Sequence, residues 1–248
     1  MSRDERALAA GLNDAGIPPV LARGELEIVG RLANASNGTF LVRARLGDDH
    51  ALAVYKPRQG EAPLWDFPDG TLCAREVAAY VVARSLGWPN VPPTVLRDGP
   101  FGVGSVQRFV RFDPTEHALT LVGGFPEEFR GIALFDLVVN NADRKAGHCL
   151  LGEDGAIHVI DHGVCFSPEP KLRTVLWDFA GQAVPGTARD ELSALAVEIG
   201  GGRLHDELSS LLDEEELAAL TDRAETTARL ERFPEPDVDR RPFPWPPI

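Results

Sequence analysis

The chain has 248 residues, 44% of them hydrophobic, so it is long and apolar enough for one two-lobed domain or two small ones. A net charge of −13 and a pI near 4.9 disfavour nucleic acid and anionic membranes as partners, so no stable membrane association is expected. The three cysteines lack metal-site spacing and no apolar stretch approaches the ~18 residues of a membrane span, which predicts reduced thiols in a cytoplasmic protein.

Short strands and turns fill the N-terminal half. Strands are predicted at residues 25–32, 39–46, 51–55, 91–96 and 103–110, with apolar and polar residues alternating in the second of them. The first three are separated by short turn clusters, which predicts a three-stranded antiparallel meander. The apolar spacing of residues 72–86, closed by Gly87, predicts one strong helix behind these strands.

Helices dominate the C-terminal half. They are predicted at residues 129–140, 187–200 and 206–231, with Glu214-Glu215-Glu216 as a solvated helix start. The proline-rich stretch 233–248 is expected to wrap the surface in extended form, with a docking peptide as the alternative. Because a linker rich in Pro, Thr and Gly begins near residue 113, we predict an N-terminal lobe at 1–112 and a C-terminal lobe at 113–248.

Two aspartates frame a predicted hairpin. Asp143 precedes one short apolar run, Asp161 follows another, and the turn signal Gly152-Glu153-Asp154-Gly155 lies between the runs. One carboxylate therefore stands at each end of the hairpin, on one rim. Phosphoryl transfer uses such a pair, one aspartate orienting the attacking hydroxyl and the other holding the magnesium that bridges the phosphates. Singly, each aspartate is typical of an ordinary turn or cap.

A lysine lies upstream at the distance that a kinase requires. Lys56 ends the third predicted strand, and Glu76 lies in the first half of the following helix. A helix carboxylate can hold such a lysine so that its ammonium reaches the α- and β-phosphates. The alternative is that Glu76 is a surface charge paired with Arg75 or Arg84.

Two further segments are candidates for nucleotide contacts. The turn between the first two strands is a weak glycine-rich loop with only Gly38, where Ser36, Asn37 and backbone amides could contact phosphate oxygens. The segment from Gln107 to Phe109 leaves the last strand before the linker, where an adenine would hydrogen-bond to backbone. An ordinary edge strand is the alternative there.

These motifs, taken in order, resemble the phosphatidylinositol 3-/4-kinase superfamily. They are Val-Tyr-Lys-Pro (54–57), Arg-Glu-Val-Ala-Ala-Tyr (75–80), Val-Pro-Pro-Thr (91–94), Gly-Ser-Val-Gln-Arg-Phe (104–109), Asn-Ala-Asp-Arg-Lys-Ala-Gly-His (141–148) and Ile-Asp-His-Gly (160–163). The tracts 63–72 and 171–177 are similar to small actinobacterial members of that superfamily. The resemblance covers residues from about 25 to 180 and implies an α+β, two-lobed protein-kinase-like fold: an antiparallel sheet plus one helix, then a mainly helical lobe with a catalytic hairpin.

The resemblance also implies roles for individual residues. Lys56 would hold the phosphates of ATP and Glu76 would orient it, while Asp143 would be the catalytic-loop aspartate and Asp161 the magnesium ligand. Lys145 could neutralise the transferring phosphoryl group. Where kinases usually carry a second, asparagine metal ligand, this chain has His148, a poor partner for Mg²⁺. One Mg²⁺, the use of Mn²⁺, or a water-bridged second ion all remain open.

The expected function is that of an Mg-ATP-dependent kinase. Because the chain lacks a basic amphipathic helix and is strongly acidic, a protein hydroxyl or a soluble small molecule is at least as probable an acceptor as a lipid. The loop 63–67 and the segment 164–177 are candidates for acceptor contact, although Trp65 and Trp177 could be packing residues. The alternatives are a nucleotide-binding pseudokinase, an AMP-transferring regulatory protein, or a structural partner-binding domain.

Overall fold

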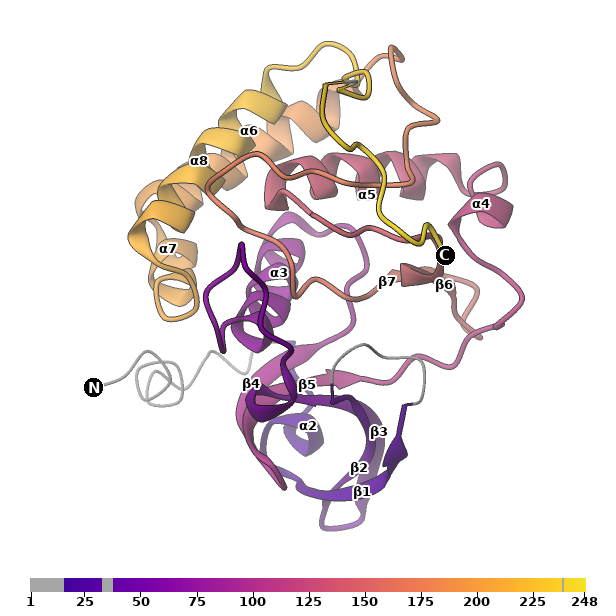
Figure 1. The fold of residues 1–248 in the computed structure, drawn as a ribbon, viewed down its shortest axis with the longest axis vertical. Coiled ribbons are helices and arrows are strands. Elements are labelled where there is room, and N and C mark those ends of the chain that lie inside the picture. The colour runs from indigo at the N-terminus through magenta and orange to yellow at the C-terminus, as the bar shows by residue number, and fades with distance from the viewer. Residues whose placement is uncertain (1–15, 33–37, 238) are drawn as a thin grey trace.

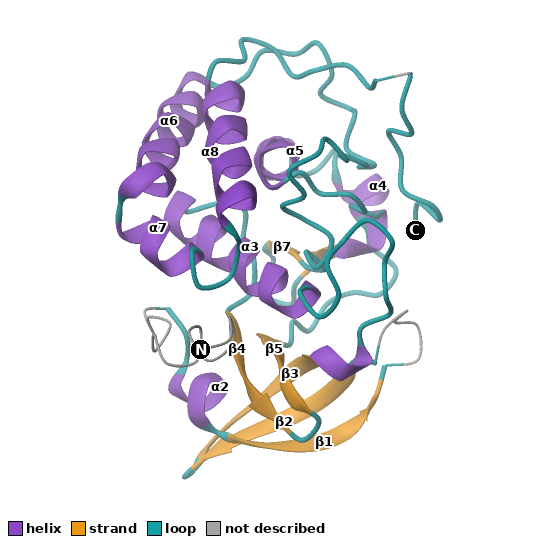
Figure 2. Ribbon diagram, turned by 60° about the vertical axis from the view of Figure 1, so that its left-hand side comes forward, coloured by secondary structure: helices purple, strands orange, loops and turns teal. Residues whose placement is uncertain are grey.

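The computed structural model describes residues 16–32, 38–237 and 239–248. It places a five-stranded sheet at one end of the molecule and a group of helices at the other (Figure 1). The short β6–β7 hairpin (Cys149–Leu151 and Ile157–Val159) lies between them (Figure 2). The α+β, two-lobed arrangement predicted from the sequence is therefore confirmed.

The sheet has the antiparallel order β1-β2-β3-β5-β4. Its strands are β1 (Glu25–Arg31), β2 (Phe40–Leu46), β3 (Asp49–Pro57), β4 (Thr94–Gly99) and β5 (Gly102–Arg108). The predicted meander is confirmed as β1, β2 and β3. The fourth strand starts later than predicted, since Pro92 and Pro93 have no amide to donate to a neighbouring strand. The short helix α2 (Pro19–Arg23) packs beside β2 and β3.

Helix α3 (Leu72–Leu86) is confirmed and ends at Gly87, whose φ of 86° suits a residue without a Cβ. It is buried on nearly every side, because it contacts β4 and β5 on one side and the C-terminal helices on the other. The apolar stripe predicted on one face of this helix therefore underestimates how much of the helix is buried. Even the charged side chains of Arg75 and Glu76 are buried in it, so each needs a partner.

The C-terminal lobe holds α4 (Ala118–Leu121), α5 (Pro126–Val139), α6 (Gly186–Gly201), α7 (Arg203–Leu208) and α8 (Glu214–Ala228). The continuous helix predicted at 206–231 is wrong, because the chain breaks after Leu208 and restarts at Asp213. The Asp213 carboxylate accepts from the Glu216 amide, 2.9 Å away, and caps the new helix. Glu216 is not solvated as predicted but is buried in an ion pair with Arg75.

The proline-rich tail runs in extended form over the C-terminal lobe and ends beside β6 (Figure 1). Its first anchor is Phe233, whose buried ring packs against Phe179. The extended surface course predicted for this stretch is confirmed. All three cysteines are buried free thiols, as expected. The predicted boundary at residue 113 falls between β5 and α4 and stays a prediction.

Candidate active site

Lys56 brings the two lobes together. It lies near the end of β3, and its Nζ is 2.5 Å from Glu76 Oε1 on α3 and 2.9 Å from Asp161 Oδ1 in the C-terminal lobe. Burial alone would lower the pKa of Lys56, but the charges of Asp161 and Glu76 outweigh it and raise the pKa. The ammonium is therefore charged throughout the neutral range and faces two carboxylates from opposite lobes.

Both oxygens of Glu76 are hydrogen-bonded. Oε1 accepts from Lys56, and Oε2 accepts from the backbone amide of His162, 3.0 Å away. Burial raises the pKa of this carboxyl, while Lys56 acts in the opposite direction. The alternative partners of Glu76 are excluded, because Arg75 pairs with Glu216 and Arg84 pairs with Glu207.

Asp161 stands just after β7 with a φ of 64°. Aspartate tolerates this left-handed conformation better than most residues, and it turns the carboxylate toward Lys56. The adjacent ammonium of Lys56 holds the pKa of Asp161 well below its usual value. The side chain is 49% exposed, so an ionised carboxylate remains accessible from solvent.

Asp143 lies on the loop after α5. Its backbone amide donates to Asn141 Oδ1 at 3.0 Å, and its Oδ2 is 3.4 Å from Lys145 Nζ. Burial raises the pKa of Asp143, partly offset by Lys145 and reinforced by the charge of Asp161. The two predicted aspartates thus act on one another electrostatically, with Lys145 beside the first.

A buried ion pair that was not predicted from the sequence supports this loop. The guanidinium of Arg144 contacts Asp136 on α5 through three hydrogen bonds of 2.9 to 3.2 Å, with neither side chain exposed. It also donates to the Ile160 carbonyl at 2.8 Å and lies 2.7 Å from His162 Nε2. Arg144, the residue after Asp143, therefore contacts both sequence neighbours of Asp161.

His148 lies beside the metal candidate. Its Nδ1 accepts from the Lys145 amide at 3.3 Å, which leaves the proton of a neutral ring on Nε2. That nitrogen is 3.3 Å from Asp161 Oδ2. Burial lowers the pKa of His148 to about 4, so the ring is neutral at physiological pH.

The glycine loop is described only at its edge. Ser36 and Asn37 lie outside the described residues, so their predicted phosphate contacts stay predictions. Gly38 donates to the carbonyl of Gly60 at 2.9 Å, and a Cβ on Gly60 would lie 2.9 Å from the Gly38 Cα. Gly38 and Gly60 therefore allow the described edge of the loop to contact the 3₁₀ turn η1 (Arg58–Gly60), and the role of Gly60 was not predicted from the sequence.

Some of the groups predicted to contact adenine already form hydrogen bonds within the protein. The side chain of Gln107 is buried and donates to Thr94 Oγ1 at 2.9 Å. The amides of Arg108 and Phe109 donate to the carbonyls of Pro93 and Leu52. These two amides are not available to an adenine, and the nucleotide role of Gln107 and Phe109 stays a prediction.

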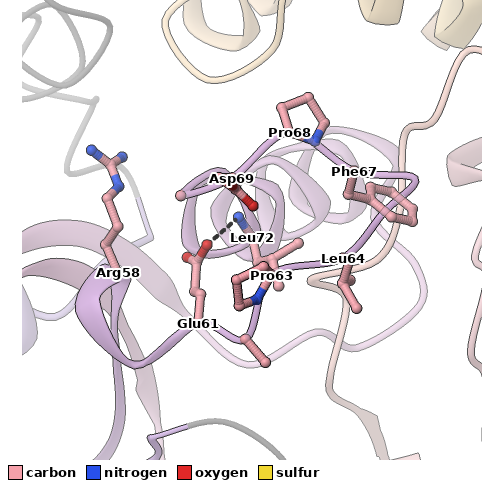
Figure 3. Close-up of a pocket in the computed structure, with 10 residues that line it drawn as sticks. Arg58, Glu61, Pro63, Leu64, Phe67, Pro68, Asp69 and Leu72 are labelled. Atoms are coloured by element: carbon pink, nitrogen blue, oxygen red, sulfur yellow. Dashed lines mark hydrogen bonds between the residues drawn. The ribbon is translucent and has the colours of Figure 1, made fainter.

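The two candidate acceptor segments meet. Lys171 Nζ lies 3.1 Å from Asp66 Oδ2 and 5.3 Å from the centroid of the Trp65 ring, which is itself 93% exposed. Glu61 accepts from the amides of Leu72 and Cys73 and so caps α3. Figure 3 shows the bond from Leu72. A pocket of about 240 Å³ opens there, lined by Arg58, Glu61, Ala62, Pro63, Leu64, Phe67, Pro68, Asp69, Gly70 and Leu72.

Comparison with known proteins finds several that are similar to this chain. The chain is 38% identical over 262 residues to the protein Rv2133c of Mycobacterium tuberculosis, covering 92% of this chain and 94% of the relative. It is 30% identical to phosphatidylinositol 4-kinase gamma 2 of Arabidopsis thaliana and 29% identical to phosphatidylinositol 4-kinase gamma 4 of Oryza sativa subsp. japonica. The chain spans only 38% and 32% of the length of those plant proteins.

The fold has a solved counterpart. The proinflammatory kinase CtkA of Helicobacter pylori superposes with a TM-score of 0.53 at 15% identity, covering 83% of this chain and 96% of that one. No protein-family model matches the chain. The similarity to Rv2133c extends over nearly the full length of both chains and shows that this chain belongs to the same family as that actinobacterial protein, while part of the chain is similar to plant phosphatidylinositol 4-kinases.

Proposed function

We propose that this protein is an ATP-dependent kinase that transfers the γ-phosphate to a hydroxyl group of a protein or a soluble small molecule. The observation that carries the proposal is the position of Lys56, between Glu76 on α3 and Asp161 after β7. A buried carboxylate that fixes a lysine opposite a metal-binding aspartate is the arrangement that positions ATP phosphates in kinases.

In the proposed reaction, the acceptor hydroxyl oxygen forms a bond to the γ-phosphorus as the bond from that phosphorus to the β,γ-bridging oxygen breaks, and ADP leaves. Asp143 orients the hydroxyl and accepts its proton, which then passes to solvent. Its raised pKa suits a carboxylate that takes up a proton. Lys145 beside it offsets the negative charge that builds on the transferring group.

The protein groups available as metal ligands fit a magnesium ion that is held partly by ATP. Among the residues that the structure describes, no group of three or more His, Cys, Asp and Glu side chains is placed to bind a metal. Mg²⁺ bound with ATP commonly uses only one or two protein carboxylates, and Asp161 is ionised and half-exposed. Asp161 would hold the ion, which would supply positive charge to offset the negative charge of the phosphates.

We infer that His148 positions Asp161 instead of binding the metal itself. The Lys145 amide occupies the lone pair of Nδ1, and Nε2, 3.3 Å from Asp161 Oδ2, carries the proton of the neutral ring, so neither nitrogen offers a metal a free lone pair. A metal ligand at His148, with Mn²⁺ as the preferred ion, is the competing assignment. Because this position carries histidine where kinases usually carry asparagine, a nucleotide-binding pseudokinase or an AMP transferase is the second candidate function.

The experiment is a turnover assay with two labels. The purified protein and its Asp143→Asn variant are incubated with Mg²⁺, a bacterial extract as acceptor source, and ATP labelled at either the γ- or the α-phosphate. A kinase transfers only the γ-label, and the variant loses transfer by on the order of 10² or more. Transfer of the α-label would show an AMP transferase. Tight ATP binding without transfer or hydrolysis would show a pseudokinase, and a chain that binds no nucleotide would be a structural domain.

A further inference from the structure

The catalytic loop forms a short two-stranded pairing with the segment that follows Asp161. Arg144 pairs with Thr174 in a parallel bridge. The Arg144 amide donates to the Arg173 carbonyl at 2.9 Å, and the Val175 amide donates back to the Arg144 carbonyl at 3.2 Å. Backbone groups of an extended chain point alternately to its two sides. Thr174 therefore presents its amide on the opposite edge.

The C-terminal tail occupies that edge. The Thr174 amide donates to the Pro242 carbonyl at 3.0 Å, and the Trp177 indole donates to the same oxygen at 3.2 Å. Farther along, the Pro247 carbonyl accepts from the Ala146 amide at 2.8 Å, on the catalytic loop itself. The tail thus contacts residue 174 through Pro242 and the loop of Asp143 through Pro247, and it ends beside that loop (Figure 1).

The tail is held mainly through its backbone carbonyls. Of residues 239–248 only Pro244 is buried, and the large apolar side chains point outward, with Phe243 48%, Trp245 76% and Ile248 62% exposed. Among the described residues, the tail side chain that bonds to the body of the protein is that of Arg240, which donates to the Pro170 carbonyl at 3.1 Å. A segment with so little buried apolar area is readily displaced by another extended chain.

The tail also lacks anything that a kinase could phosphorylate. Thr227 is the last residue with a hydroxyl group, and residues 228–248 contain no Ser, Thr or Tyr. An extended segment thus lies along the catalytic loop, bound by main-chain hydrogen bonds, without offering an acceptor oxygen. Such bonds do not depend on the side chains of the bound segment, so a different sequence can form them.

From this arrangement we propose that the acceptor binds to the edge of residues 173–175 that faces away from the catalytic loop and is occupied by the tail. The acceptor is an extended polypeptide. Residues 239–248 are a tethered, non-phosphorylatable occupant of that edge and compete with the acceptor. The inference rests on the proposed kinase function and narrows its acceptor to a Ser- or Thr-bearing protein segment. The chemistry is the same transfer, from ATP to the hydroxyl oxygen, with ADP released and the proton taken by Asp143.

Giving the tail a hydroxyl group tests the placement directly. Phe243→Ser, Trp245→Ser and Ile248→Ser are each incubated, as full chains, with Mg²⁺ and γ-labelled ATP, and the labelled residue is identified by mass spectrometry. The matched control is Val197→Ser on α6, an apolar residue that is 74% exposed. We expect label on at least one introduced tail serine at a rate independent of protein concentration, and none on the control.

A second measurement tests the competition. A full-length chain with both Arg240→Ala and Trp177→Phe loses two hydrogen bonds that involve the tail but keeps its hydrophobic core. A synthetic peptide of residues 239–248 with serine in place of Trp245 is the acceptor probe, and Arg229→Ala, an exposed helix charge, is the control. We expect the loosened chain to phosphorylate the peptide about tenfold faster than the parent, and the control to match the parent.

The outcomes separate this inference from the function on which it rests. If no tail serine is labelled and the loosened chain gains nothing, while Asp143-dependent transfer to an extract acceptor persists, the acceptor assignment is wrong and the kinase stands. If the parent neither binds ATP nor consumes it, both proposals fail.

Discussion

Glu76 and His162 are joined across the two lobes by a hydrogen bond of 3.0 Å from the His162 amide to the Glu76 carboxylate. The same carboxylate holds Lys56 through its other oxygen. The helix of the N-terminal lobe therefore fixes the phosphate-binding lysine and, at the same time, the backbone next to Asp161. Movement of α3 would displace both groups together.

The double role of Glu76 leads to the first prediction. An amide in place of the carboxylate has only one acceptor oxygen, so in Glu76→Gln either Lys56 or His162 faces a donor. Losing a hydrogen bond to a charged group costs about 1.5–3 kcal/mol, so Mg-ATP should bind at least about tenfold more weakly by titration calorimetry. Glu207→Gln is the control, since Glu207 bonds Arg84 on the same helix. Equal affinities for the parent and both variants would contradict the assignment.

The second prediction concerns the buried pair of Arg144 and Asp136. In the parent, the charge of Asp136 outweighs the effect of burial and raises the pKa of Arg144 above its ordinary value. Asp136→Ala leaves this buried guanidinium without its counter-charge. Such a loss destabilises a protein by about 3–5 kcal/mol. The melting temperature should fall by on the order of 10 °C, whereas Glu225→Ala, which removes an exposed partner of Arg229, should leave it nearly unchanged. Similar melting curves for both variants would argue against this role.

The third prediction separates the two assignments of His148. Glutamine offers an N–H donor near the position of Nε2 and alanine offers none, so a positioning role predicts that His148→Gln keeps most of the Mg-dependent ATP turnover. His148→Ala should lose about tenfold. If His148 were instead a metal ligand, both variants would lose turnover alike and the ratio of Mn²⁺- to Mg²⁺-supported rates would change.

The fourth prediction concerns alkaline pH. Burial raises the pKa of Cys73 to about 12 and that of Cys149 to about 12, from an ordinary value of 9.0. The folded chain therefore keeps protons that the unfolded chain loses, so the free energy of unfolding should fall as the pH rises above about 9. The raised pKa of Lys56 has the same sign at higher pH.

Urea denaturation between pH 8 and 11 measures this slope. A thiol reagent at pH 8 should meanwhile find almost no reactive cysteine in the native protein and all three in denaturant. Rapid labelling of the native protein, or a flat stability profile up to pH 11, would contradict the burial of these thiols.

The sequence predicted those parts of the site that depend on local pattern and chain order. A lysine at a strand end, a glutamate early in the next helix, and aspartates at both ends of a hairpin are each placed by short-range structure. In the structure Lys56, Glu76 and Asp161 lie together, as the chain order predicted.

The buried charges could not be predicted in the same way. Arg75, Glu216 and Arg144 look like solvated helix or loop charges, and only the tertiary packing of α3 against α8 and of the catalytic loop against α5 buries them. The break before α8 did carry a local signal, since Asp213-x-x-Glu216 before an apolar run is a capping box. The course of the tail along residues 173–175 has no signal in the sequence, because it depends on backbone edges.

The most direct test of the central claim is calorimetric titration of ATP, with and without Mg²⁺, into Asp161→Asn and Asp143→Asn, paired with γ-phosphate turnover. We predict that Asp161→Asn weakens the Mg-dependent part of binding, since it removes an ionised carboxylate beside Lys56. Asp143→Asn should bind as the parent does and lose turnover by on the order of 10² or more. Two variants that bind and turn over ATP like the parent would contradict the account.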